Sequence, residues 1–391
     1  MKRIEVSAKI YYVGVNDRRK NLFENNWPLP NGVSYNSYII ADNKTDLIDT
    51  LVFCSKDDYL DTIEVILEGR TLDYLIVNHM EPDHSSMISI LLKFYPEMKV
   101  IGNNKTFKML DAYYKLNPNN FQEVADGEEL DLGINKLRFV MTPWVHWPET
   151  MMTYEVNNKI LFSCDAFGTF GTFDGSIFDE EINFSFYEDE ARRYFSNIVG
   201  KYSNMVQKAL SRLSGVELKM VCPSHGPVWR SDPDKIVSLY DKWSRFESEE
   251  GVVIAFASMY GNTEKMADYV ARLIAEKGIK NIRIFDVSKT HPSFIISEIW
   301  KYKSVLLGSS AYNATMHPMM EHLCSELEII NPKMKKFGLF GSFSWSGGGV
   351  KYLKAFADKM EWSLVSEPVE LIGVPDITKM VSFNELSEKI I

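Results

Sequence analysis

The sequence predicts an α/β protein of two domains, a β-rich first domain with intervening helices and a second domain built on a doubly wound parallel sheet. Three observations predict this class. From residue 251 onward, strand and helix patterns alternate regularly, which is typical of a doubly wound parallel sheet. Before it, short apolar strands and hairpin turns dominate. Between them lies the charged segment Glu247-Ser248-Glu249-Glu250, so we place the domains at residues 1–250 and 251–391.

The elements of the first domain follow from apolar periodicity and turn residues. Hairpins are expected where Asp42-Asn43-Lys44 and Asn157-Asn158 join apolar strands, because these residues favour turns. Residues 188–212 are expected to form one long helix. The other expected elements are strands at 10–15, 38–41, 45–50, 74–77, 99–102, 151–156 and 159–163, paired strands within 127–145, and helices at 56–68, 87–95, from 104, and at 236–246.

The second domain is expected to contain five strands separated by helices, a rhythm that suits a flavodoxin-like fold. Strands are predicted at 252–257, 282–286, 304–308, 336–341 and 364–372. Helices are predicted at 264–277, 293–302, 318–327 and 348–359, with a final helix at the end of the chain.

Composition excludes several classes of protein. The 391 residues are 45% hydrophobic and 25% charged, with a net charge of −10 and no basic cluster, which argues against a nucleic-acid partner. No apolar run approaches the roughly 20 residues of a membrane span, and the first seven residues lack the apolar core of a signal peptide. The four cysteines are widely spaced, so we expect a reducing, cytoplasmic location and no four-thiolate iron centre.

Four potential metal ligands lie close together after the predicted strand at 74–77. They are His79, Glu81, Asp83 and His84, and Pro82 disfavours a smooth helix start, so we expect a loop. Alternate residues of an extended segment face the same way, so His79, Glu81 and Asp83 can converge. His84 can then turn to a second metal beside Asp83, and one loop can serve two metals.

Three further candidate ligands repeat this plan of apolar strand, ligand and loop. They are His146, Asp165 and His225. Imidazole and carboxylate together suit ferrous iron, whereas zinc prefers sets rich in imidazole or thiolate. Trp144 and Trp147 flank one of these histidines, and we expect them to keep the site apolar.

A second candidate site follows the first strand of the second domain. Hydroxyl and backbone NH groups precede a helix there, and a helix N-terminus can hold a phosphate without a lysine or an arginine. An ordinary capped turn is the alternative, because serine, asparagine and threonine also cap helices. The candidate residues are Ser258, Met259, Tyr260, Gly261, Asn262 and Thr263.

Two more loops are expected to meet the first at the carboxyl ends of the strands, where such sheets bind ligands. Trp345 offers a stacking surface for a flat ring. The first loop lacks Gly-x-Gly-x-x-Gly, which favours FMN over NAD or FAD. The candidates are Ser309, Ala311, Tyr312 and Asn313 in one loop, and Ser342, Phe343, Ser344, Trp345 and Gly347 in the other.

The pattern His79-x-Glu81-x-Asp83-His84 with His146, Asp165 and His225 resembles the ligand set of flavodiiron proteins, and the three later loops resemble a flavodoxin FMN site. The resemblance covers nearly the whole chain. It implies a metallo-β-lactamase-like αββα sandwich and a diiron centre. One iron would be held by His79, Glu81 and His146, the other by Asp83, His84 and His225, with Asp165 bridging. Zinc hydrolases of that superfamily usually have histidine where Glu81 stands.

The resemblance also implies a reaction and partners. Such proteins reduce O2 to water, NO to nitrous oxide, or both, with electrons relayed through FMN from rubredoxin or a similar donor. They form a head-to-tail homodimer or a dimer of dimers. Two alternatives stay open: a zinc-dependent hydrolase fused to a flavodoxin module, and a non-catalytic sensor of redox state or gas. His291, His317 and His322 lack carboxylate partners at ligand spacing, so we expect helix caps or surface residues.

Overall fold

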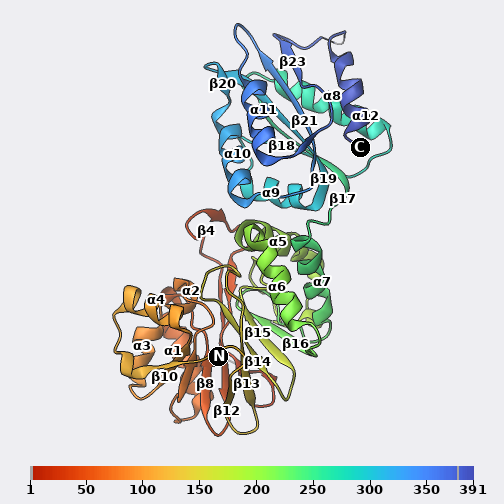
Figure 1. The fold of residues 1–391 in the computed structure, drawn as a ribbon. Coiled ribbons are helices and arrows are strands. Elements are labelled where there is room, and N and C mark those ends of the chain that lie inside the picture. The colour runs from red at the N-terminus through yellow and green to blue at the C-terminus, as the bar shows by residue number, and fades with distance from the viewer. Residues whose placement is uncertain (1–2, 377) are drawn as a thin grey trace. The chain divides into compact units, whose positions relative to one another are not determined.

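The computed structural model describes residues 3–376 and 378–391, so the first two residues of the N-terminal stretch considered above lie outside it. The chain packs into two compact units (Figure 1). The first extends to Phe195 and takes in Tyr202–Asp241, and the second comprises Ser196–Lys201 and Lys242–Ile391. Residues 242–250, assigned above to the first domain, therefore pack with the second unit. Among the described residues, no helix is both long and apolar enough to span a bilayer.

The first unit is a four-layer αββα sandwich, as the resemblance implied. In Figure 1, α1, α3 and α4 cover one sheet and α5, α6 and α7 cover the other. The first sheet has the order β1 (Ile4–Ser7), β2 (Ile10–Tyr12), β7 (Tyr38–Ala41), β8 (Thr45–Ile48), β9 (Tyr74–Ile76), β10 (Lys99–Gly102) and β11 (Phe121–Glu123). The second has the order β12 (Glu129–Asp131), β13 (Lys136–Met141), β14 (Met151–Glu155), β15 (Ile160–Cys164) and β16 (Met220–Pro223).

The remaining elements of this unit are two small hairpins and the helices. The hairpins are β3 (Val15–Asp17) with β6 (Val33–Tyr35), and β4 (Leu22–Phe23) with β5 (Trp27–Pro28). The helices are α1 (Lys56–Leu67), α2 (Pro82–Ser85), α3 (Ile88–Phe94), α4 (Asn104–Tyr114), α5 (Glu188–Tyr194), α6 (Ser203–Leu213) and α7 (Pro233–Ser244).

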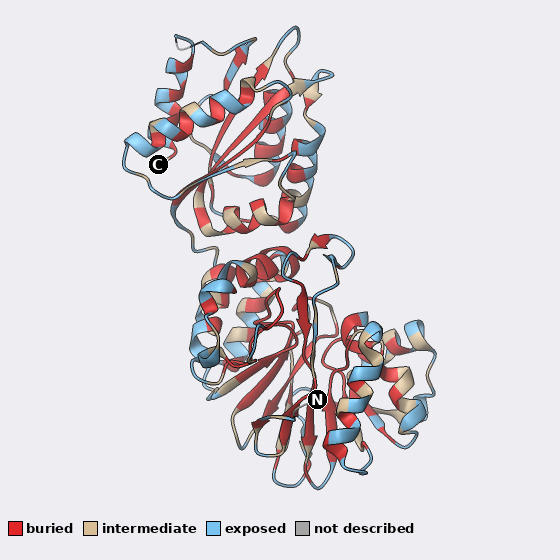
Figure 2. Cartoon of the chain, turned by 180° about the vertical axis from the view of Figure 1, so that it is seen from behind, coloured by how far each residue is buried: buried red, intermediate tan, exposed pale blue. Residues whose placement is uncertain are grey.

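The core of the first unit lies between its two sheets. Ile40 and Ile76 from the first sheet pack in one cluster with Phe139 and Phe162 from the second. Figure 2 shows the strands of both sheets as largely buried and the outward helix faces as exposed. Burying both sheet faces holds the strand ends rigidly, and the loops at those ends carry the candidate ligands.

Three predictions for this unit are wrong. The strand predicted at 10–15 divides into β2 and β3, which belong to different sheets. The segment after β9 is not entirely a loop, because Pro82 begins the short helix α2. Proline at the first helical position is favourable, since the NH it lacks would have no partner there. The long helix predicted at 188–212 is interrupted by a π-helical turn over Phe195–Val199 and a 3-10 turn over Gly200–Tyr202. Glycine weakens a helix interior, so Gly200 favours the 3-10 turn that begins there; nothing in the sequence accounts for the π-helical turn before it.

The second unit confirms the doubly wound parallel sheet. Its strand order is β18 (Ile282–Asp286), β17 (Glu249–Ala257), β19 (Tyr302–Tyr312), β21 (Lys336–Phe343) and then β22 (Ser363–Leu364) with β23 (Val369–Ile372). These pairs are parallel, and the short β20 (Thr315–Met316) lies antiparallel to β19. The order matches flavodoxin-like folds. The helices are α8 (Asn262–Glu276), α9 (Pro292–Lys301), α10 (Pro318–Ile330), α11 (Gly349–Met360) and α12 (Phe383–Lys389).

Four strands of this unit differ from the prediction. β17 begins at Glu249 instead of residue 252, and β21 continues to Phe343 instead of ending at residue 341, so Ser342 and Phe343 belong to β21 and not to a loop. The strand predicted at 304–308 continues to Tyr312, so Ser309, Ala311 and Tyr312 belong to β19 and not to a loop. The last predicted strand, 364–372, divides into β22 and β23. Pairing with β20 explains the extension of β19, because the antiparallel contact continues the ladder beyond the parallel sheet.

Candidate functional site

The seven candidate ligands come from four places in the first unit. His79, Glu81, Asp83 and His84 follow β9, and the last two lie in α2. The others lie in the loop between β13 and β14, directly after β15, and just after β16; they are His146, Asp165 and His225. All seven are buried.

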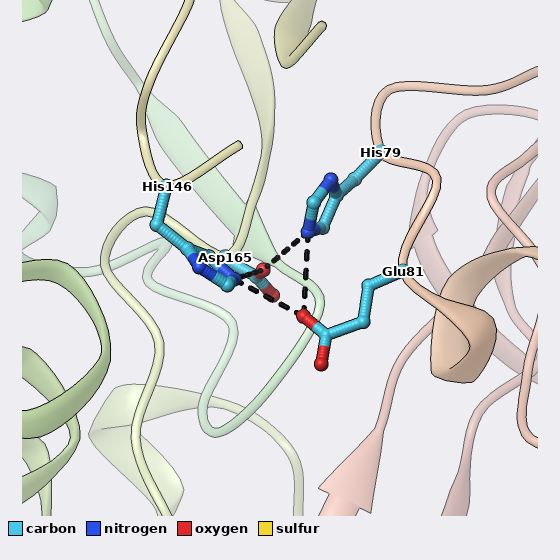
Figure 3. Close-up of side chains that lie close together, drawn as sticks. All are labelled: His79, Glu81, His146 and Asp165. Carbon is cyan, nitrogen blue, oxygen red and sulfur yellow. Dashed lines mark hydrogen bonds and ion pairs between the residues drawn. The ribbon is translucent and has the colours of Figure 1, made fainter. Parts of the chain in front are cut away.

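The first group of ligand atoms gathers around one point (Figure 3). Glu81 Oε2 lies 3.4 Å from His79 Nε2 and 3.1 Å from His146 Nε2. Asp165 Oδ2 lies 3.3 Å from His79 Nε2 and 3.2 Å from His146 Nε2. Ligand atoms about 2.0–2.2 Å from one metal ion lie about 3.0–3.5 Å from one another, so these separations suit a shared metal.

The second group uses the other oxygen of the same aspartate. Asp165 Oδ1 lies 3.0 Å from His84 Nε2 and 3.4 Å from His225 Nε2. Asp83 completes this group, with Oδ1 3.4 Å from His84 Nε2 and Oδ2 3.4 Å from His225 Nε2. Asp165 therefore faces each group with a different oxygen, the arrangement of a bridging carboxylate.

These atoms are buried and lack ordinary partners. Among the described residues, Nε2 of His79, His84 and His225 and both carboxylate oxygens of Asp83 and Asp165 make no hydrogen bond. Unpaired buried polar atoms are costly, and so many pointing at one another require an occupant. Two cations bound by nitrogen and oxygen donors satisfy them, so the residues fit a dinuclear metal centre.

The carboxylates shift the imidazoles toward their charged form when no metal is bound. Burial alone lowers the pKa of His79, but the hydrogen bond with Glu149 and the nearby carboxylates of Glu81 and Asp165 outweigh it and raise that pKa to about 10. Burial also lowers the pKa values of His146 and His84, but the neighbouring carboxylates raise them by more. The pKa of His146 becomes about 10 and that of His84 about 9. Protons and metal ions therefore compete for the same nitrogens.

This competition predicts how pH affects the metal-free protein. A histidine whose pKa is higher in the folded than in the unfolded protein stabilises the folded state. This contribution is complete below the unfolded pKa of about 6.5 and is lost as the pH rises through the folded pKa. We therefore expect the melting temperature of chelator-treated protein to fall as pH rises from about 6.5 and to level off above the folded pKa values of about 9 to about 10. Thermal unfolding followed by circular dichroism measures it. Metal-loaded protein is the control and should lack this slope, since bound metal requires neutral imidazole; identical slopes would contradict the prediction.

Two carboxylates that support the ligands were missed from the sequence. Glu149 Oε1 lies 2.7 Å from His79 Nδ1 and accepts a hydrogen bond from the Met80 NH at 2.9 Å. Asp49 accepts from the Asn78 NH at 2.7 Å and from the Asn78 side chain at 3.2 Å. Both had a signal. Asp49 directly follows the apolar pair Leu47-Ile48 at the end of β8, and Glu149 shares a loop with His146.

Aromatic rings surround the ligands. Trp147 stands edge-on to His79, with ring centroids 5.1 Å apart, and Phe23, Tyr35 and Tyr194 lie 5.4, 5.4 and 5.6 Å from His225. This shell limits water around the centre. Trp147 thus lies against a candidate ligand, where its half-buried ring can keep the site apolar.

The expectation for Trp144 is wrong. Its ring is 42% exposed and stacks on Tyr202, with centroids 5.8 Å apart. Trp144 has a left-handed backbone, with φ of 67°, and lies two residues before the candidate ligand His146.

In the second unit, a cavity of about 100 Å³ lies at the carboxyl ends of β17, β19 and β21. All three predicted segments contribute to it. Nine of the predicted residues line the cavity: Ser258, Met259, Tyr260, Asn262, Ala311, Ser342, Phe343, Ser344 and Trp345. Three further residues complete the lining and were not among the candidates: Ser310, Ala314 and Ser346. Polar atoms and a large aromatic ring together suit a phosphate-bearing flat ligand.

The other candidates do not line this cavity and have different surroundings. Gly261 has φ of 84°, a backbone that favours glycine, and its NH donates to Ser258 Oγ at 3.0 Å. Thr263 Oγ1 lies 2.9 Å from Ser342 Oγ and so ties two segments together. Ser309, Tyr312, Asn313 and Gly347 likewise lie outside the lining.

The three remaining histidines have structural surroundings, as expected. The side chains of His291 and His317 cap α9 and α10 by accepting from the NH groups of Ser293 and Met319. His322 is half-exposed and lies 3.6 Å from Glu326.

Comparison with known families agrees with this architecture. Residues 33–226 match the family described as ODP family beta lactamase, and residues 254–365 match the flavodoxin family. A nitric oxide reductase of Moorella thermoacetica is 31% identical over 93% of this chain and 92% of its own length. An anaerobic nitric oxide reductase flavorubredoxin of Pectobacterium carotovorum is 33% identical over 89% of this chain and 70% of its own.

Solved structures extend the match over the whole chain. Rubredoxin oxygen:oxidoreductase from Desulfovibrio gigas superimposes with a TM-score of 0.96 at 28% identity, covering 100% of this chain and 98% of that one. The flavodiiron protein of Giardia intestinalis gives a TM-score of 0.95 at 25% identity, covering 100% and 96%. The fold and site thus define a lactamase-like metal domain joined to a flavodoxin domain. The chain belongs to the flavodiiron protein family.

Proposed function

We propose that this protein is a flavodiiron oxidoreductase that reduces O2 to water, NO to nitrous oxide, or both. One observation carries the proposal: the two oxygens of Asp165 face two separate groups of nitrogen and oxygen donors. His79, Glu81 and His146 would hold one iron, and Asp83, His84 and His225 the other. The named relatives are oxidoreductases, so a zinc-dependent hydrolase is not favoured, and neither is a non-catalytic sensor.

FMN is the flavin that the second unit would bind. Its flavodoxin domain and the cavity at the strand ends support this assignment. Ser258–Gly261 precede α8, and Asn262 and Thr263 are its first two residues, so the segment surrounds a helix N-terminus that suits a phosphate. Trp345 at the cavity offers a ring for stacking. Gly347, Asn313 and Tyr312 stay candidates that flank the ring.

The chain's own residues supply geometry and exclude water, and two bound irons would pass to O2 or NO the electrons that they receive through FMN from the external donor. Glu149 fixes the His79 ring with Nε2 facing inward. The Ser34 carbonyl does the same for His225, accepting from Nδ1 at 2.7 Å. Phe23, Tyr35 and Tyr194 pack around His225, so small uncharged molecules enter an apolar surround more readily than ions do.

We propose that the electrons come from an external carrier. The four cysteines are free and lie apart in the chain, with three of them buried and Cys54 exposed, which does not suit a four-thiolate iron centre. Rubredoxin or a similar carrier is therefore the proposed donor. We further propose a head-to-tail homodimer, or a dimer of dimers, in which the FMN of one chain serves the iron centre of its partner, and a cytoplasmic location, which free cysteines favour.

Metal analysis and turnover test the proposal together. We expect two irons and one FMN per purified chain, and consumption of O2 or NO when reduced rubredoxin is supplied. Gas electrodes for each substrate measure the two rates and reveal the preference. Protein reconstituted with zinc is the control and should be inactive, because zinc does not change its oxidation state. Two zincs per chain with hydrolytic activity and no gas consumption would contradict the proposal.

A further inference from the structure

The two proposed metal positions differ in what stands behind a histidine ligand. At the first, His79 Nδ1 lies 2.7 Å from the carboxylate of Glu149. At the second, His225 Nδ1 donates to the backbone carbonyl of Ser34, also at 2.7 Å. The lengths are equal, but one acceptor is an anion and the other is a neutral dipole.

Glu149 is surrounded by donors that suit a carboxylate. Its Oε1 lies 2.7 Å from His79 Nδ1 and accepts a hydrogen bond from the Met80 NH at 2.9 Å. Its side chain is fully buried, and Oε2 makes no hydrogen bond among the described residues. The Glu149 carboxylate therefore has few interaction partners besides the His79 ring and the Met80 NH.

The start of α4 fixes Glu149 in place. The Asn103 side chain donates to the Glu149 carbonyl at 2.6 Å and also caps α4 by accepting from the NH groups of Lys105 and Thr106. Lys105 Nζ donates to the Pro148 carbonyl at 3.0 Å. A capped helix thus anchors the loop from two points, so the carboxylate cannot easily swing away from His79.

We infer that Glu149 makes the two positions electronically unequal, so that iron held by His79, Glu81 and His146 gives up an electron more readily than iron at the other position. A hydrogen bond to an anion makes the opposite nitrogen of an imidazole a stronger donor. The nearby negative charge also favours the more highly charged metal. The proton stays between Nδ1 and Oε1, and no bond at Glu149 forms or breaks. Glu149 is a positioning residue that acts through His79.

This inference rests on the proposed function, because it assumes iron at both positions. Its test is Glu149→Gln in the full-length protein loaded with iron and FMN. Glutamine keeps an oxygen for His79 and Met80 but removes the charge. We expect a redox titration, followed by electron paramagnetic resonance of the half-reduced centre, to show a higher potential. We also expect iron(II) affinity of the metal-free protein, measured by chelator competition, to fall about 10- to 100-fold.

Two variants separate charge from simple structural damage. Glu149→Asp restores the negative charge and should restore the potential at least in part. Glu155→Gln is the matched control: Glu155 is also buried and accepts the Asn157 NH at 3.1 Å, but it lies at the opposite end of β14. It should leave the potential unchanged.

The outcomes distinguish failure of this inference from failure of the proposed function. If wild type lacks a diiron centre, the proposed function fails. If Glu149→Gln holds two irons with unchanged potential and affinity, the inference alone is overturned. Should Glu149→Gln not fold, Asn103→Ser keeps a capping hydroxyl but removes the amide that holds the Glu149 carbonyl. It should raise the potential by a smaller amount, and an unchanged potential would overturn the inference.

Discussion

Asp165→Ala is expected to lose both irons and to reduce turnover by at least about 100-fold while flavin content stays at one per chain. Asp165 places Oδ2 beside His79 and His146 and Oδ1 beside His84 and His225. Removing it takes a donor from both positions and leaves four imidazoles with less negative charge around them. Metal analysis, flavin absorbance and gas consumption measure the three quantities.

Variants of two histidines sharpen this expectation. His146 contacts Glu81 and the oxygen of Asp165 that faces the first group, so His146→Ala should retain about one iron per chain, at the second position, and should also be inactive. His322 is half-exposed beside Glu326 and belongs to neither group, so His322→Ala should keep both irons and full activity. Two irons retained in Asp165→Ala would show that the bridging assignment is wrong.

The ligand residues were predictable because strand ends are where a sheet exposes side chains to one common edge. Asp165 and His225 follow neighbouring parallel strands, β15 and β16, so pairing brings them together wherever the strands pair in register. The apolar runs before them mark those strands in the sequence. Recurrence of the same plan at several strands makes the set recognisable without coordinates.

The local sequence pattern does not predict which candidate ligands belong to which of the two metal positions. Strand-like alternation groups Asp83 with His79 and Glu81, but Asp83 lies in the first turn of α2 and joins His84 and His225 instead. Proline at the first helical position was interpreted as a break when it marks a helix start. The resemblance to a known ligand set gave the division that the local pattern missed.

Supporting residues were the hardest to predict, because they depend on contacts between distant segments. Glu149 reaches His79 across 70 positions of sequence, and Asn103 reaches the Glu149 carbonyl across 46. No periodicity encodes such contacts. The same limit explains the extension of β19, which follows from pairing with β20 and not from its own composition.

Trp345→Ala is expected to weaken FMN binding by about 10- to 100-fold, since stacking of an aromatic side chain on a base contributes about 1–3 kcal/mol. Trp345 lines the cavity but is 81% exposed, so its removal leaves no hole in the core and the unit should still fold. Titration of FMN into flavin-free protein, followed by quenching of flavin fluorescence, measures the affinity. Iron content should not change, because the ligands lie in the other unit.

Trp345→Phe completes the test of this stacking surface. Phenylalanine keeps a flat ring and should bind FMN within a few-fold of wild type. Wild-type affinity in Trp345→Ala would show that the ring does not stack on the flavin. Asp165→Ala should keep flavin without iron, and Trp345→Ala should keep iron with little flavin. Mixing the two variants should not restore donor-driven turnover while their subunits stay together. Partial recovery of turnover after subunit exchange would support electron transfer between chains.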